Sequence, residues 1–215
     1  MNIVLYGPTG KSGSRILTEL TTRGHHVTAI ARNPSKVAAT PNTTVLEGDV
    51  SNVDAIAKAI TGADAVISAY GPPPDDTKQL IGATDNIVKA VERVSAANPQ
   101  HAPRLVVVGG AGSLFVAPGV TLHASGHLPA EWIPISDAHI AVLEALEKSS
   151  IDWTYFSPAA YFEPGKRTGK FRLGKDDLIA DEKHESRISM EDYAIALVDE
   201  LEQPKHRRER FAIGY

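Results

Sequence analysis

The chain has 215 residues, 42% of them hydrophobic and 22% charged, and a formal net charge of −4. This length and composition are typical of one well-packed globular domain, and the acidic balance argues against a nucleic-acid partner, which selects a basic surface. The absence of cysteine excludes disulfides, thiol catalysis and thiolate metal sites. No signal peptide is recognisable, and no apolar stretch approaches the roughly 20 residues that span a bilayer. We therefore expect a cytoplasmic protein that binds neither nucleic acid nor membrane.

The N-terminal stretch combines a short apolar run with three glycines spaced three apart, Gly7, Gly10 and Gly13, and a helical pattern follows. Strand, tight turn and helix in this order are typical of the first unit of a dinucleotide-binding sheet. Gly7 allows the sharp turn, Gly10 lets the backbone approach a pyrophosphate, and Gly13 lets the helix pack against the strand. The N–H groups at the start of the helix favour phosphates. Further cofactor contacts are expected from the other loop residues, Thr9, Lys11 and Ser12.

Apolar runs and helical periods alternate along the rest of the chain. The predicted strands after the first cover 26–32, 44–50, 64–71, 104–112, 152–158 and 210–215. The predicted helices cover 11–23, 51–60, 77–96, 136–148 and 190–201, with Gly24 stopping the first, Ser51 capping the second and Ser189 capping the last. Continuous apolar strands are typical of a sheet that helices cover on both faces. The prediction is an α/β fold, a doubly wound parallel sheet of the Rossmann type, formed by residues 1–215 as a single domain.

Two stretches interrupt this alternation. Residues 113–135 contain Gly and Pro, have no helical period, and include Phe115, His123, His127 and Trp132. Because they leave the carboxyl end of a central strand, where ligands bind in such sheets, we interpret them as a substrate-side flap. An ordinary surface excursion is the alternative. Residues 163–189 hold short extended pieces at 170–173 and 186–188 and are predicted to form a small substrate-side segment.

The end of the second strand indicates which dinucleotide is preferred. An acidic residue at this point of the fold binds the ribose 2′-hydroxyl, whereas this chain has Arg32, followed by Asn33 and Lys36. A planar guanidinium suits a 2′-phosphate, so NADP(H) is predicted to be preferred over NAD(H), with a solvated turn arginine as the alternative. Asp49 and Val50 end the third strand. The Asp is expected either to accept from the adenine amino group or to complement a helix dipole.

The two strands beside the glycine loop end in mostly small residues, which would leave room for the nicotinamide half of the cofactor. These residues are Ser68, Ala69, Tyr70 and Gly71 on one strand and Gly109, Gly110 and Ala111 on the other.

The residues that could assist catalysis are few. Many short-chain dehydrogenases use a Tyr-x-x-x-Lys pair as the acid, but none of the six tyrosines here has a Lys four positions later. His139 is either a weak acid or a structural residue, and Ser113 either binds a substrate or belongs to a turn. Hydride transfer to an extended conjugated acceptor needs less help from an acid, because the added charge spreads over the ring system. No spacing of His and carboxylates indicates a metal site.

Four segments together resemble the NADH-flavin reductase family, which are atypical short-chain dehydrogenases of the NAD(P)-binding NmrA-like group. The segments are 7–13, 105–114, 157–165 and 186–197, and the likeness extends over essentially the whole chain. Residues 137–140 are also similar to a stretch of biliverdin-IX beta reductase, a flavin and tetrapyrrole reductase.

The resemblance implies an NAD(P)H-dependent oxidoreductase that transfers hydride to a small conjugated acceptor. The acceptor would be a flavin (FMN, FAD or riboflavin), a quinone or a tetrapyrrole, bound near Ser113 and His139. Pro158, Ala159, Ala160 and Tyr161 would then lie near the nicotinamide. An NmrA-like redox-sensing regulatory protein without turnover is the alternative. We expect a monomer or homodimer.

Overall fold

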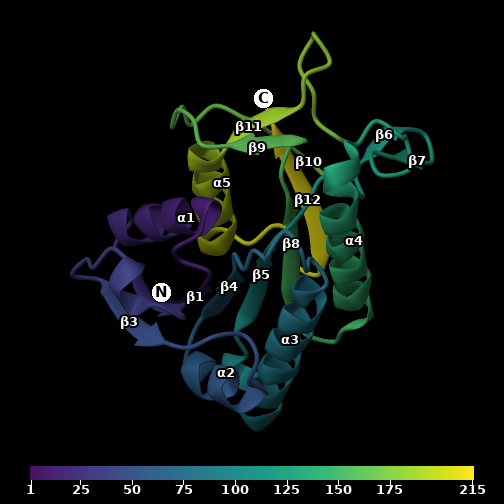
Figure 1. The fold of residues 1–215 in the computed structure, drawn as a ribbon. Helices are drawn as coiled ribbons and strands as arrows, with labels where there is room; N and C mark the ends of the chain where they lie inside the picture. The colour runs from purple at the N-terminus through teal and green to yellow at the C-terminus, as the bar shows by residue number, and fades with distance from the viewer.

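A computed structural model describes residues 1–215 and shows an eight-stranded sheet in the order β10–β12–β8–β5–β4–β1–β2–β3 (Figure 1). Neighbouring strands are parallel except β10, which pairs antiparallel with β12. The strands of this sheet are β1 (Asn2–Tyr6), β2 (His26–Ala31), β3 (Thr43–Glu47), β4 (Ala65–Ser68), β5 (Arg104–Val108), β8 (Trp153–Ser157), β10 (Arg172–Gly174) and β12 (Glu209–Gly214). The predicted doubly wound α/β fold is confirmed.

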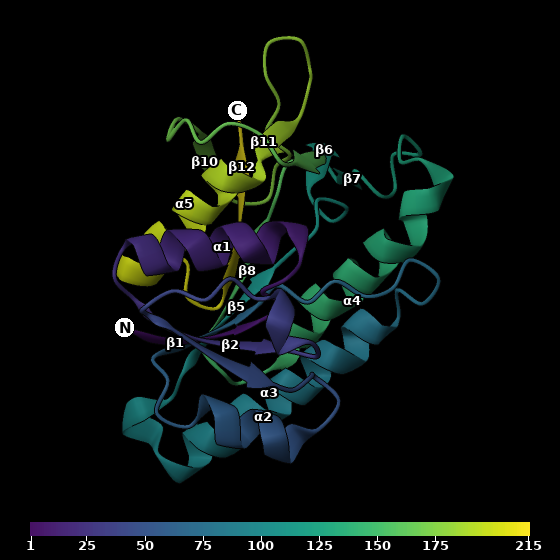
Figure 2. The same cartoon turned by 60° about the vertical axis from the view of Figure 1, so that its left-hand side comes forward.

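Five α-helices cover the two faces of the sheet. They are α1 (Lys11–Thr22), α2 (Val53–Ile60), α3 (Gln79–Ala97), α4 (Ile133–Lys148) and α5 (Met190–Glu202). Figure 2 shows α1 and α5 on one face and α2, α3 and α4 on the other. Each face packs a hydrophobic cluster of 24 buried residues, so the two cores are of equal size. This explains why the strands are apolar at successive positions and do not alternate. None of the helices is both long and apolar enough to cross a membrane.

The strand order reverses beside β1, because β2 lies on one side of it and β4 on the other. In open α/β sheets, ligands bind in the crevice outside the carboxyl ends of the strands at such a reversal. The glycine turn that follows β1 therefore lies where a cofactor is expected.

The ends of three helices test the capping predictions. Gly24 follows α1 with φ of +82°, and the Ser189 hydroxyl accepts a hydrogen bond from the Asp192 N–H at 3.0 Å, so both predictions are confirmed. The prediction that Ser51 caps α2 is wrong. Asn52 is the cap, and its Oδ1 accepts from two N–H groups of the first turn at 2.9 and 3.1 Å. Ser51 lies one residue before the cap and instead donates its N–H and hydroxyl to Asp49 at 2.8 and 2.6 Å.

Residues 113–135 contain more regular structure than the sequence indicates. Strands β6 (Phe115–Ala117) and β7 (Val120–Thr121) form a hairpin, and a 3₁₀ turn over Ala130–Trp132 leads into α4. This helix begins at Ile133, three residues before the predicted start, because Pro134 is favourable in a first turn.

Short strands also organise the C-terminal segment. The extended pieces predicted at 170–173 and 186–188 correspond to β10 and to β11 (Arg187–Ser189). A further strand, β9 (Tyr161–Glu163), was not predicted and pairs parallel with β11. The segment also contacts the hairpin, since the Phe115 N–H donates to the Asp176 carbonyl and the Leu178 N–H donates to the Phe115 carbonyl, both at 2.8 Å.

Candidate functional site

The turn after β1 requires glycine at two of its three glycine positions for reasons internal to the fold. Gly7 has φ of +80°, and a side chain there would overlap the carbonyl of Ala69 on the adjacent strand. A Cβ at Gly13 would overlap the Gly7 carbonyl, so α1 packs against the turn only because that carbon is missing. At Gly10 the nearest atom to a Cβ would be the Gly7 oxygen at 3.4 Å, an ordinary contact. The fold therefore leaves room for a side chain at position 10, where glycine is the residue that directly precedes α1.

The N-terminus of α1 is open to an anion. Gly10 precedes the helix in an extended conformation and supplies no side-chain cap, and the first turn contains no acidic residue. By contrast, Asn52 and Ser189 cap α2 and α5, and both helices have acidic residues in their first turns. The first N–H groups of α1 and its positive dipole end are thus left for phosphates. Lys11 is exposed at the first helical position, and Ser12 beside it is half-buried.

A cavity of about 360 Å³ adjoins this turn at the ends of β1, β2 and β3. Of the predicted cofactor residues, it is lined by Gly7, Thr9, Arg32, Asp49, Val50 and Tyr70. It is also lined by residues that the sequence did not indicate, among them Tyr6, Gln79 and Asn86. Tyr6 ends β1 directly before Gly7, and that adjacency is the one sequence signal that could have indicated it. The size is within the range of small-molecule pockets.

Three of the polar side chains that line this cavity are held in place by hydrogen bonds. The Asn86 amide donates to the Val50 carbonyl at 2.9 Å, which ties α3 to the exit of β3. The Tyr70 hydroxyl donates to Gln79 Oε1 at 3.2 Å. The cavity wall is therefore formed by side chains from distant parts of the chain that are already oriented without a ligand.

The charged groups at the ends of β2 and β3 are only partly engaged. Arg32 is exposed and has no carboxylate within ion-pair distance, so its guanidinium is free for a phosphate. Hydrogen bonds from Ser51 hold the pKa of Asp49 below its usual value, with a smaller contribution from the charge of Arg32. The Asn33 side chain accepts from the Ser35 N–H and hydroxyl, and Lys36 is exposed in the turn that follows. Neither Asn33 nor Lys36 lines the cavity.

The residues predicted for the nicotinamide half lie at the next strand ends. Ser68 and Ala69 are buried, Tyr70 is half-buried and Gly71 is exposed. The glycines after β5 also have a packing reason within the protein itself. A Cβ at Gly109 would lie 2.5 Å from the Tyr155 ring, one at Gly110 would lie 2.9 Å from His139 Cγ, and one at Gly112 would overlap Ser136 Oγ. The space of these glycines is thus filled by protein side chains, and Ala111 between them is half-buried.

His139 lies against this glycine run and is linked to a residue that the sequence did not indicate. The hydroxyl of the fully buried Tyr155 lies 3.2 Å from His139 Nδ1 and accepts a hydrogen bond from the Gly110 N–H at 2.9 Å. Loss of hydration lowers the pKa of His139 to about 4, so the imidazole is neutral at pH 7. Burial raises the pKa of the Tyr155 hydroxyl, which stays protonated. Tyr155 lies within an apolar strand, and no local pattern separates it from an ordinary core aromatic.

Ser113 connects the flap to β12, which lies two strands away from β5 in the sheet. Arg210 Nη1 donates to Ser113 Oγ at 2.8 Å and to its carbonyl at 3.0 Å, and Arg210 also pairs with Asp176. The Ser113 hydroxyl therefore accepts one hydrogen bond, and its own proton is left to donate to a ligand. The same arginine holds three distant segments of the chain together.

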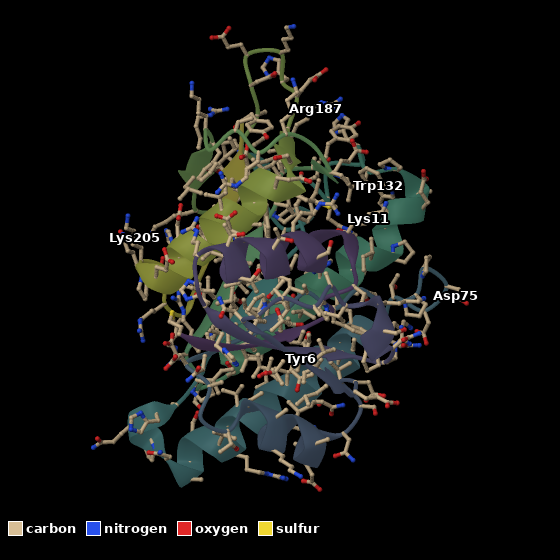
Figure 3. All side chains as sticks on the ribbon, turned by 90° about the vertical axis from the view of Figure 1, so that its left-hand side faces the viewer. Tyr6, Lys11, Asp75, Trp132, Arg187 and Lys205 are labelled. Atoms are coloured by element: carbon tan, nitrogen blue, oxygen red, sulfur yellow. The ribbon has the colours of Figure 1, made fainter.

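Aromatic side chains are exposed on the predicted substrate side. Pro158 and Ala159 are buried and Ala160 is half-buried, and the chain then reaches Tyr161, which is 45% exposed. The Tyr161 ring packs edge-on against Trp132 at 6.1 Å between centroids, and the Arg187 guanidinium lies 4.6 Å from the Tyr161 ring centre. In Figure 3, Arg187, Trp132 and Lys11 lie along one side of the molecule, and Lys205 lies on the opposite side. The Trp132–Tyr161 pair thus joins the 3₁₀ turn before α4 to β9, and both rings are partly exposed.

Comparison with known proteins agrees with this geometry. A Bacillus subtilis protein named uncharacterized protein YwnB is 42% identical over 217 residues, which cover 99% of this chain and 98% of that protein. A solved structure of a "putative epimerase" from Bacteroides thetaiotaomicron has a TM-score of 0.90 and 45% identity, and the match covers 100% of this chain and 96% of that one. A "putative NADH-flavin reductase" from Streptococcus pneumoniae has a TM-score of 0.87 and 32% identity, and that match covers 100% and 99%.

The sequence also matches a protein family directly. Residues 7–204 match the family described as NAD(P)H-binding, a range that begins at the first glycine of the turn and ends just after α5. The matched range contains the glycine turn, the cavity beside Arg32 and helix α4, which carries His139. The chain belongs to the NAD(P)H-binding family.

Proposed function

We propose that this protein is a cytoplasmic NADPH-dependent reductase that transfers hydride to a flavin or to a similar conjugated acceptor. The observation that carries the proposal is the cavity beside the glycine turn, where Arg32 is free of ion pairs and no acidic residue takes the place of the ribose-binding carboxylate at the end of β2. A planar guanidinium at this position favours a 2′-phosphate. The whole-length likeness to the Streptococcus protein supports the choice of a flavin-like acceptor.

Different residues of the chain would bind NADPH and the acceptor. The N–H groups at the start of α1 would bind the pyrophosphate, and Arg32 would bind the 2′-phosphate. Bound there, NADPH would supply a hydride, which brings two electrons and one proton to the acceptor. Water would supply the second proton. The exposed rings of Trp132 and Tyr161 would stack on the acceptor. The protein would then act mainly by holding the two reactants in contact.

The chemistry of the site favours a conjugated acceptor over a simple ketone. A ketone needs an acid that protonates the oxygen as hydride arrives, and the chain has no Tyr-x-x-x-Lys pair. His139 does not fill this role at neutral pH, because its lowered pKa of about 4 keeps it uncharged. A conjugated ring system spreads the added charge over several atoms and depends less on such an acid.

The test measures cofactor affinity and turnover separately. Isothermal titration should show that NADPH binds more tightly than NADH, and that Arg32→Ala weakens NADPH by about 1.5–3 kcal/mol with little effect on NADH. Lys58→Ala, which removes an exposed positive charge from the last turn of α2, is the matched control and should change neither affinity. Steady-state NADPH oxidation with FMN, riboflavin and quinones then tests the acceptor. Equal affinities for the two cofactors, or no oxidation with any acceptor, would contradict the proposal, and the second result would favour a regulatory role.

A further inference from the structure

The Tyr6 hydroxyl is a buried polar group without a partner in the protein. Tyr6 is only 2% exposed and lies inside the molecule (Figure 3), where it belongs to the hydrophobic cluster beneath α2, α3 and α4. Burial alone raises the pKa of this tyrosine, because no hydrogen bond within the protein reaches the hydroxyl, which therefore stays protonated. The oxygen is nevertheless not among the side-chain atoms that are sealed from water without a partner. Since Tyr6 lines the cavity beside the glycine turn, its hydroxyl opens into that cavity.

Asn86 lines the same cavity and has an unused hydrogen-bond acceptor. Its Nδ2 donates to the Val50 carbonyl at 2.9 Å and to the Ser51 carbonyl at 3.3 Å. A side-chain amide has two N–H donors, so both are used, and the opposite orientation would bring Oδ1 against two carbonyl oxygens. No group of the protein donates to Oδ1, and this oxygen is not sealed from water either. Asn86 therefore offers a ligand an acceptor and not a donor.

The other polar side chains that line the cavity are exposed at its rim or bonded to a neighbour. They are Thr9, Arg32, Asp49 and Ser51, which are exposed, and Tyr70, whose hydroxyl donates to the exposed Gln79 at 3.2 Å. One carboxylate oxygen of Asp49 also accepts from both the N–H and the hydroxyl of Ser51. The buried residues Ile30, Val50 and Ala83 supply apolar wall. The inner part of the cavity thus offers one O–H donor and one amide oxygen between apolar surfaces.

We propose that Tyr6 and Asn86 select the adenine base of the dinucleotide, with the Tyr6 hydroxyl donating to the base and Asn86 Oδ1 accepting from its 6-amino group. A donor and an acceptor between apolar walls complement adenine, a flat ring whose edge carries an amino group beside ring nitrogens. Hypoxanthine has a carbonyl oxygen in place of the amino group, and this oxygen would face Asn86 Oδ1 with no proton between them. The inference rests on the cofactor of the proposed function. It assigns the amino group to Asn86 and not to Asp49.

Tyr6→Phe tests whether the hydroxyl serves a ligand or the fold. The ring keeps its packing and no hydrogen bond within the protein is lost, so the melting temperature should not fall below that of the wild type. Isothermal titration should show NADPH binding about three- to tenfold more weakly, the range of one hydrogen bond. Tyr193→Phe is the matched control, because that buried hydroxyl donates to the Phe156 carbonyl at 2.7 Å on the other face of the sheet. This control should melt below the wild type and bind NADPH as tightly. An unchanged NADPH affinity in Tyr6→Phe would overturn the role of Tyr6.

The role of Asn86 is tested by comparing NADPH with its deamino analogue, in which hypoxanthine replaces adenine. Titration followed by nicotinamide fluorescence should show the wild type binding NADPH about three- to tenfold more tightly, and Asn86→Ala should bring this ratio close to one. If Asn86 only tied α3 to Val50, the variant would weaken both cofactors by the same factor and keep the ratio. Equal binding of both cofactors to the wild type, or a ratio that Asp49→Ala removes and Asn86→Ala keeps, would overturn the proposal.

A fragment of the cofactor tests whether both residues act on the adenosine half. Adenosine 2′,5′-bisphosphate contains the base but no nicotinamide, so Tyr6→Phe and Asn86→Ala should weaken its binding by the same factors as they weaken that of NADPH. An unchanged affinity for this fragment in either variant would overturn the assignment to the base. Because every readout is binding, the inference is decided even if NADPH is not oxidised with any acceptor, a result that would count against the reductase proposal alone.

Discussion

Gly10 and Gly13 lie three residues apart in one turn, yet alanine at each is expected to fail in a different way. Gly10 has φ of −72° and ψ of 167°, which alanine adopts readily, and its Cβ would have no neighbour closer than 3.4 Å. The reduced freedom of the unfolded chain stabilises such a variant by about 0.4–1 kcal/mol, and the poorer capping by alanine offsets part of this gain. Gly10→Ala should therefore unfold within about 1 kcal/mol of the wild type.

At Gly13 the same methyl group would overlap the Gly7 carbonyl, which is backbone and cannot turn aside. Overpacking of this kind costs about 1–3 kcal/mol. For a chain of this length, each kcal/mol lowers the melting temperature by roughly 2–4 °C. Gly13→Ala should thus melt several degrees below the wild type, whereas Gly10→Ala should melt close to it.

Gly10→Ala, the variant that should leave stability nearly unchanged, is expected to weaken cofactor binding directly. A methyl group at Gly10 occupies the approach to the α1 N-terminus, and losing two charge-assisted phosphate contacts would cost about 3 kcal/mol or more, roughly a hundredfold in affinity. Gly10→Val should abolish binding. Thermal denaturation by circular dichroism and titration with NADPH measure the two quantities. If folded Gly10→Ala binds NADPH as tightly as the wild type does, the glycine loop is only a turn and the reasoning fails.

Three further outcomes are expected. Ser113→Ala and His139→Ala should each lower flavin turnover by roughly tenfold or less, because the loss of a true catalytic acid would lower the rate by about 10²–10⁴-fold. A thousandfold loss of turnover at unchanged NADPH affinity would reveal a dedicated acid. Because the pKa of His139 is lowered in the folded protein, only the unfolded chain binds a proton at this residue between pH 6.5 and about 4. The free energy of unfolding should therefore rise with pH in this window, and about 2–3 kcal/mol is lost as the pH falls through it. Urea unfolding at pH 7 and at pH 4.5 should show a smaller loss for His139→Gln than for the wild type. Trp132→Ala should raise the KM for flavin about three- to tenfold through lost stacking without changing the Kd for NADPH, whereas Leu173→Ala, a similarly exposed apolar residue, should change neither.

The fold and the cofactor half could be predicted because their signals are local in sequence. Gly7, Gly10 and Gly13 follow one another within a single turn, and Arg32 is found by counting along the chain to the end of the next strand. The error at Ser51 shows where local reasoning ends. Ser51 and Asn52 are both good capping residues, and the choice between them depends on Asp49, whose carboxylate binds Ser51.

The acceptor half could not be predicted to the same depth because its contacts join residues far apart in sequence. Tyr155 looks like any buried aromatic of a strand until Gly110 and His139 are seen around its hydroxyl. The glycines after β5 also make room for side chains from β8 and α4, which the sequence did not indicate. Strand β9 has three residues, and its existence depends on a partner strand that begins 26 residues later.

The two halves of the site are also stabilised by different means. The cofactor half depends on backbone geometry, because the carbonyl of Gly7 and the missing side chain of Gly13 hold α1 against the sheet. The proposed acceptor half depends on side-chain hydrogen bonds, and the single residue Arg210 contacts both Ser113 of the flap and Asp176 of the C-terminal segment from β12. Changes in the flap or in residues 163–189 can therefore alter the surface around Ser113 while the glycine turn stays intact.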